Sequence, residues 1–156
     1  MNQTAPDLLQ ATAFRALGGQ SADGGIGAVL KDGAPVGSFT YGTNAQATLD
    51  DNLPTPQIQL YPLTASEKPG TDRVERYDAA ISFLTSVEGL GDDRPGLNAG
   101  VAEMRRLKDK FMSELDRHPL VEITEVRSEE VRNAQQAMLT GISVAFTIAV
   151  PALATC

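Results

Sequence analysis

The last 24 residues of the chain, 133–156, contain no charged side chain, although 33 of the 156 residues are charged. Within this segment, large apolar residues occupy the even positions from Ile142 to Val150, and small or hydroxyl residues occupy the odd positions. This period of two, rich in β-branched residues, is typical of a β-strand, which Pro151 cannot continue because it lacks a donor. A membrane-anchoring tail helix needs about 20 mostly apolar residues and shows no such alternation. The pattern therefore predicts a long final strand over residues 138–150.

A strand of this length needs cover on its apolar face. Residues 138–150 would extend about 44 Å at roughly 3.4 Å per residue, more than the core of a domain of this size needs. Such a strand lies in the centre of its own sheet or is partly covered by a neighbouring subunit, because an uncovered apolar edge aggregates. We therefore expect a homo-oligomer, for which cyclic symmetry is the usual solution.

The composition excludes several classes of function. One His, one Cys and no Trp leave no zinc finger, no intramolecular disulfide and no aromatic base-stacking platform. A net charge of −7 argues against a general binder of nucleic acids or anionic membranes, since both require a cationic surface. The N-terminus lacks the basic and apolar regions of a secretory signal, so we expect synthesis inside the cell.

The few candidate catalytic groups have simpler structural interpretations. His118 lies at the end of a predicted helix, before a proline, where a histidine is compatible with the helix dipole. Asp92 and Asp93 are adjacent acids in a Gly/Pro loop with no third ligand at the spacing of a calcium loop. The glycine-rich residues 18–27 lack the Gly-Lys-Ser/Thr of a phosphate-binding loop and are expected to be a connector. We predict no enzyme activity, no cofactor and no metal.

The best-defined helix is predicted over residues 98–117, where Asn98 is the N-cap and an apolar stripe follows. Its other faces carry Arg105–Asp109 and Lys110–Glu114, opposite charges four residues apart that are expected to pair. The remaining predicted elements are a helix over 5–17, a hairpin of 28–30 with 36–41, a short or edge strand over 57–61, a strand rather than a helix over 77–87, and a strand over 120–127 that is joined to the last strand by a wide loop.

These elements predict one α+β domain, in which an antiparallel β-sheet packs against one main helix, with a short N-terminal helix and long loops. The domain covers residues 1–156. Its parts are the N-terminal helix 5–17, a loop-rich part over 18–56 and the core over 57–150.

The order of these elements resembles the small α+β proteins at the neck of tailed bacteriophages, especially the tail terminators. The resemblance is clearest over residues 57–150. It rests on the run from Pro56 to Tyr61, on the helix Asn98–Arg117 and on the closing run from Met138 to Pro151. No motif of invariant chemistry defines this family, so the match is one of architecture.

The resemblance implies a structural subunit of the virion that is made in the host cytoplasm and forms a hexameric ring. Family members bind the last ring of the tail tube, stop its polymerisation and present a surface to the head connector. DNA passes through the ring without specific binding, and an acidic lumen would repel phosphate and let the DNA slide. The expected partners are further copies of the chain, the tail tube protein and the head–tail connector protein, with no membrane.

We expect the loops 64–73 and 89–96 to make axial or inter-subunit contacts, and the charged helix to meet acids of another chain. The candidate interface residues come from the second loop, the helix and the final strand: Asp92, Asp93, Arg94, Arg105, Arg106, Lys110, Ile142, Val144 and Phe146.

Two other assignments remain open at this level. A head–tail adaptor or tail-completion protein of the neck shares the size, fold and partners and differs in the ring that it touches. A small soluble ligand-binding or enzymatic α+β domain would need a pocket with converging polar groups.

Overall fold

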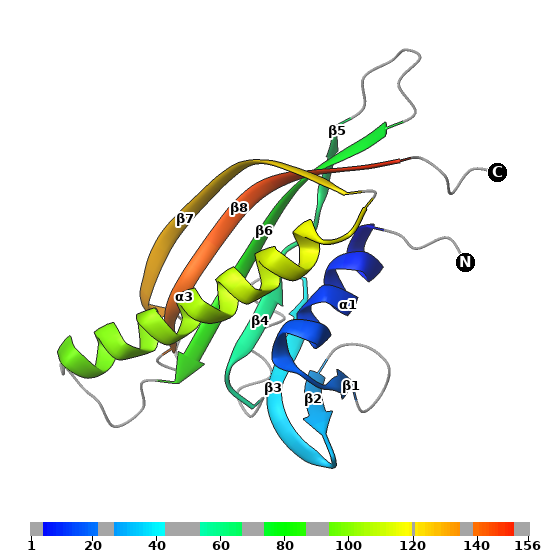
Figure 1. Ribbon diagram of the computed structural model, residues 1–156. Coiled ribbons are helices and arrows are strands. Elements are labelled where there is room, and N and C mark those ends of the chain that lie inside the picture. The colour runs from blue at the N-terminus through cyan, green and yellow to red at the C-terminus, as the bar shows by residue number, and fades with distance from the viewer. Residues whose placement is uncertain are drawn as a thin grey trace.

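The computed structural model describes residues 5–21, 27–42, 54–66, 74–86, 94–119, 121–134 and 139–151 (Figure 1). The helices are α1 (Ala5–Leu17) and α3 (Arg94–Asp116), and the strands are β1 (Gln20–Ser21), β2 (Gly27–Lys31), β3 (Ala34–Tyr41), β4 (Gln57–Leu60), β5 (Thr64–Ser66), β6 (Val74–Ser86), β7 (Glu122–Ala134) and β8 (Leu139–Pro151). The predicted α+β class is confirmed, with one main helix and a short N-terminal helix.

The strands form one sheet in the order β1-β2-β3-β4-β6-β8-β7, and β5 pairs with the beginning of β6. The pair β3–β4 is parallel and the others are antiparallel, so the sheet is mixed rather than purely antiparallel as predicted. Strand β8 lies between β6 and β7 and pairs with β6 over their full length. Of the two predicted positions for the last strand, the structure shows the central one.

Several local predictions are confirmed. Helix α1 has the predicted bounds, and of the segment 77–87 the described residues 77–86 belong to a strand, β6, rather than a helix. The β2–β3 hairpin turns at Asp32 and Gly33, whose φ angles of 53° and 81° are those that a tight two-residue hairpin turn requires. Glycine reaches such angles without steric cost, and aspartate tolerates them better than most residues.

Two other local predictions are resolved or corrected by the structure. Of the two predicted alternatives for 57–61, a short strand or an edge strand, the structure shows the short one: β4 lies inside the sheet between β3 and β6. Pro56 and Pro62 flank β4 without interrupting it, so its N–H groups are available to the ladder. Helix α3 begins at Arg94 rather than Asn98, because Pro95 in the first turn needs no N–H partner.

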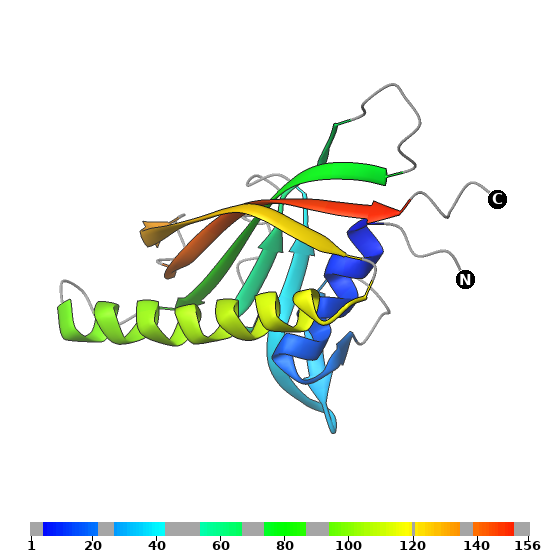
Figure 2. The ribbon, with the colours of Figure 1, turned by 45° about the horizontal axis from the view of Figure 1, so that its top comes forward.

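The core lies between one face of the sheet and the two helices, which Figures 1 and 2 show on the same side of the sheet. The cross-strand register aligns one buried apolar row over four strands: Phe39, Ile58, Phe83 and Ile142. From α3, Met104, Phe111 and Leu115 are buried against this face. Apolar side chains of the β8 even positions are therefore covered by the chain's own helices.

The opposite face of the sheet is polar. Its central row contains Thr40, Gln59, Ser82 and Ser143, which lie side by side in the register of β3, β4, β6 and β8. The Ser82 hydroxyl donates to the Ser143 hydroxyl (3.4 Å), and the Tyr61 hydroxyl lies 3.3 Å from Ser82.

Neither helix in the described part of the chain is long and apolar enough to cross a membrane.

Candidate interaction surface

Strand β7 forms one edge of the sheet. Among the described residues it pairs with β8 alone. The side chains of residues 124–130 are all exposed, and they include Val126, whose relative exposure of 49% makes it the one exposed large apolar residue in the described part. Three acids lie along this strand without an ion pair to any described residue, and we refer to them as the β7 acidic edge: Glu122, Glu125 and Glu129.

The β7 backbone is irregular next to these acids. The register with β8 shifts between Thr124 and Arg127, and Glu125 has a φ of 54°. A bulge and several charges on an edge strand oppose direct pairing with the strand of another molecule. We therefore expect a partner to meet β7 through side chains rather than by extending the sheet.

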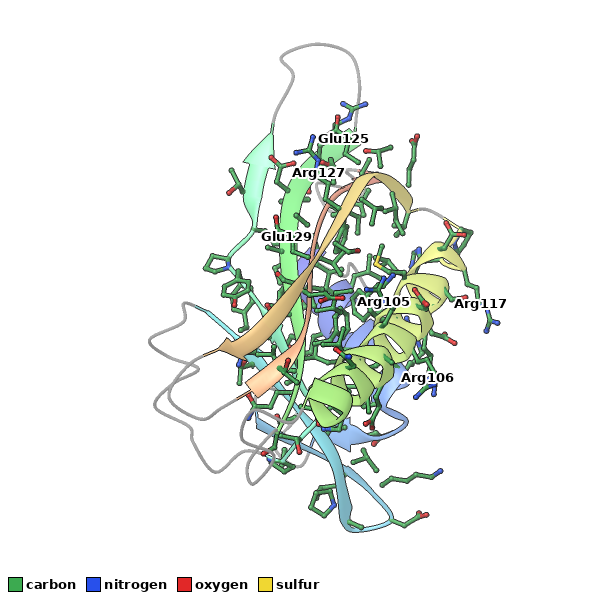
Figure 3. The ribbon with its side chains drawn as sticks, turned by 90° about the vertical axis from the view of Figure 1, so that its left-hand side faces the viewer. Arg105, Arg106, Arg117, Glu125, Arg127 and Glu129 are labelled. Carbon is green, nitrogen blue, oxygen red and sulfur yellow. The ribbon has the colours of Figure 1, made fainter. Side chains whose placement is uncertain are left out.

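The face of α3 that is turned away from the sheet is exposed and carries cations, and we refer to Arg106, Lys110 and Arg117 as the α3 basic face. Figure 3 shows Arg106 and Arg117 pointing away from the sheet, and Arg105 on the side of α3 nearer β7. The same view places Glu125, Arg127 and Glu129 on the side of β7 away from α3. The two charged surfaces are thus separate parts of the molecule.

Both ion pairs predicted within α3 are absent, because Arg105, Asp109 and Glu114 have partners on other elements or nearer in the helix. Arg105 reaches Glu130 of β7, with Nη2 3.6 Å from Oε1, instead of Asp109. The carboxylate of Glu114 lies 3.8 Å from Arg15 Nε of α1 and 3.3 Å from Arg117 Nη1.

This arrangement leaves two cations of α3 without a counter-charge. Asp109 contacts Lys108, with Oδ1 2.6 Å from Nζ. Glu114 is paired with Arg15 and Arg117. No ion pair joins Arg106 or Lys110 to the residues that the structure describes. Arg106 and Lys110 lie four residues apart, so they are neighbours on one helix face, where like charges repel each other.

The Arg105–Glu130 pair is expected to contribute little to stability. Both side chains are about half exposed, at 51% and 47%, and exposed pairs contribute about 0–1 kcal/mol. Arg105→Ala should therefore lower the free energy of unfolding by less than about 1 kcal/mol in urea denaturation. A larger loss would show that Arg105 packs against β7 through more than its charge.

The other predicted interface residues have different positions. Ile142, Val144 and Phe146 are at most 3% exposed and lie in the core of this chain, so they offer no surface to a partner. Their assignment to an interface is corrected, because α3 supplies the cover that a neighbouring subunit was expected to supply. Arg94 begins α3, and Asp92 and Asp93 lie outside the described residues.

The predicted contact loops are only partly described. Of the loop 64–73, residues 64–66 form β5, which pairs with β6. Of the loop 89–96, residues 94–96 belong to the first turn of α3. The other residues of both loops and residues 22–26 of the glycine-rich segment 18–27 lie outside the described part.

The described residues contain no group of three or more His, Cys, Asp or Glu side chains able to hold a metal ion. His118 follows α3, where its backbone N–H donates to the Leu115 carbonyl (3.1 Å) and its carbonyl accepts from the Val121 N–H (3.2 Å). These bonds close the helix and lead the chain into β7.

Glu129 of the β7 acidic edge was missed because residues 128–136 were interpreted as a connection, whereas Glu122 and Glu125 lie in the predicted strand 120–127 but were not assigned to a surface. The strand instead continues to Ala134. Exposed polar residues on β7 hide the period of two that marks a half-buried strand. The adjacent acids Glu129 and Glu130 interrupt any alternation in Arg127–Val131, so the sequence gives no strand signal there.

A scan of protein-family models finds none that matches the chain, and a search of curated proteins finds no match.

Proposed function

We propose that this protein is a structural subunit of the neck of a tailed bacteriophage, a tail terminator that assembles into a ring. The observation that supports the proposal is the succession of α1, a loop-rich group of strands, α3 across the sheet and a long C-terminal hairpin, β7–β8. This is the order of elements on which the resemblance to neck proteins rests.

In this function the molecule works by contact. The ring caps the last ring of the tail tube, stops its polymerisation and offers its other surface to the head connector. DNA passes through the lumen, where a chain of net charge −7 repels the phosphates instead of binding them.

Two measurements test this proposal. Light scattering after size exclusion, with negative-stain microscopy, should show a six-fold ring with a central opening. Adding the ring to polymerising tail tube protein of the same phage should shorten the tubes and place the protein at their ends.

Each possible result has a definite meaning. A ring that binds the head connector and leaves tube length unchanged would assign the protein to the adaptor or tail-completion class. A monomer at every soluble concentration, with no effect on tubes, would overturn the proposal.

A further inference from the structure

We propose that copies of this chain join head to tail, with the α3 basic face of one copy against the β7 acidic edge of the next. This inference rests on the proposed homo-oligomeric ring and names the surfaces that close it. The occupant of each surface is thus a second copy of the chain.

Charge complementarity is the first argument. Arg106 and Lys110 are exposed cations without an ion pair in the described part of their own chain. The three acids of the β7 acidic edge are likewise exposed and form no ion pair with any described residue. Each surface also carries one opposing charge, Glu103 one turn before Arg106 on α3 and Arg127 among the acids of β7, so cations exceed acids by two to one among the unpaired charges of the helix face and acids exceed cations by three to one on the strand. Complementary surfaces of this kind set the register and partner of an interface.

The placement of the surfaces is the second argument. The α3 basic face is turned away from the sheet, whereas β7 lies at the sheet's edge with its labelled charges on the side away from α3 (Figure 3). One copy can therefore engage one neighbour through α3 and another through β7. Contacts between two different surfaces are heterologous, and they generate a ring when the rotation closes.

The dimensions agree with this contact. The α3 basic face extends about 16 Å from Arg106 to Arg117, at 1.5 Å per residue. The acidic edge extends about 23 Å from Glu122 to Glu129, at 3.3 Å per residue, and somewhat less because of the bulge. The two rows of charge can lie alongside each other.

The exposed apolar groups lie where such a contact needs them. Val126 stands between the acids of β7, and the exposed Ala102 lies one turn before Arg106 on α3. Protein interfaces combine a less polar centre with a charged rim. The bulge at Glu125 and Val126 also opposes the main alternative, in which β7 extends the sheet of another copy.

Two charge-reversed proteins test this contact. The first carries Arg106→Glu with Lys110→Glu, and the second carries Glu125→Lys with Glu129→Lys. Each alone brings like charges together at every interface, so the subunit concentration needed for half assembly should rise by about tenfold or more. The circular dichroism spectrum should remain that of the wild type, and so should thermal unfolding at concentrations where the wild type is also unassembled, because all four side chains are exposed.

Mixing the two proteins supplies the decisive measurement. In a ring where the two proteins alternate, each interface pairs a reversed α3 with a reversed β7, or an unreversed α3 with an unreversed β7, so that opposite charges meet again. Native mass spectrometry should then show rings in which the two proteins alternate. Assembly of the wild type should weaken as ionic strength rises from about 0.01 to 1 M, where the screening length falls from about 30 to 3 Å.

A matched control and the contrary outcomes complete the experiment. Lys31→Glu changes the charge by as much as Arg106→Glu, but lies on β2 near the opposite edge of the sheet, and should assemble like the wild type. If the wild type forms rings and both reversed proteins do so equally well, this contact is wrong and the proposed function stands. If the mixture fails to recover assembly, the two faces do not meet. If the wild type never assembles, the proposed function fails together with this inference.

Discussion

Replacing Phe111 with alanine is expected to lower the free energy of unfolding by about 3–5 kcal/mol, as truncation of a buried aromatic side chain usually does. Phe111 is fully buried where α3 crosses the sheet, and its ring meets that of Phe83 edge to face at a centroid distance of 5.4 Å. The substitution removes this contact and leaves a cavity between the helix and the sheet. Urea denaturation followed by circular dichroism measures the loss.

The neighbouring side chains give this prediction a control. Ser113 lies two residues further along the same helix and is exposed, so Ser113→Ala should change stability by no more than about 0.5 kcal/mol. A loss below about 1 kcal/mol for Phe111→Ala would contradict the packing of α3 on β6. The comparison separates packing against the sheet from helix propensity, because both variants place alanine in the same helix.

Strong local patterns predicted the elements that face the core. The alternation from Ile142 to Val150 located β8 within one residue, and the predicted helix 5–17 matched α1. Each of these elements buries one face, so its apolar residues recur with the period of a strand or a helix. The same physical reason resolved β6, where enrichment in β-branched and aromatic residues favoured a strand over a helix.

Pairings between distant segments could not be predicted in the same way. Strands β3 and β4 pair in parallel, which depends on the path of the chain between them. The residues of the two strands do not indicate that path. The interior position of β4 shows only as an unusual burial of polar side chains, with Gln57 and Gln59 at 5% and 2% exposure. Their amide groups bond each other, Gln59 Nε2 donating to Gln57 Oε1 (3.1 Å), which permits this burial.

Of the two candidate surfaces, the sequence predicted the basic face of α3 and did not predict the acidic edge of β7. Helix periodicity placed Arg106 and Lys110 on the outer face of α3, and both are exposed there. The acids of β7 were not assigned, because nothing in the predicted strand 120–127 marks it as an edge of the sheet and Glu129 lay in the predicted connection. Ion pairing was the weakest part of the prediction, since spacing along a helix ignores the partners that α1 and β7 bring to Glu114 and Arg105.

Replacing Gly141 with alanine is expected to destabilise the protein by about 3 kcal/mol or more, at the upper end of the usual cost of overpacking. A Cβ atom on Gly141 would overlap the carbonyl oxygen of Phe83 and would lie 3.1 Å from Leu84 Cα. These are backbone atoms of β6, so no rotation of a side chain relieves the clash. The two strands would have to separate where β6 and β8 pair in the middle of the sheet. Thermal unfolding and the soluble yield measure the effect.

Gly100→Ala is the matched control, because it adds the same methyl group at another glycine that approaches the sheet. There the new Cβ would lie 3.1 Å from Thr140 Cγ2 and 3.4 Å from Thr85 Cγ2, both of which are side-chain atoms. Alanine is favoured over glycine in a helix by about 1 kcal/mol, which offsets the cost of this crowding. We therefore expect Gly100→Ala to stay within about 1 kcal/mol of the wild type. Equal stability of the two variants would contradict the register between β6 and β8, since only that register places Gly141 against the backbone of Phe83 and Leu84.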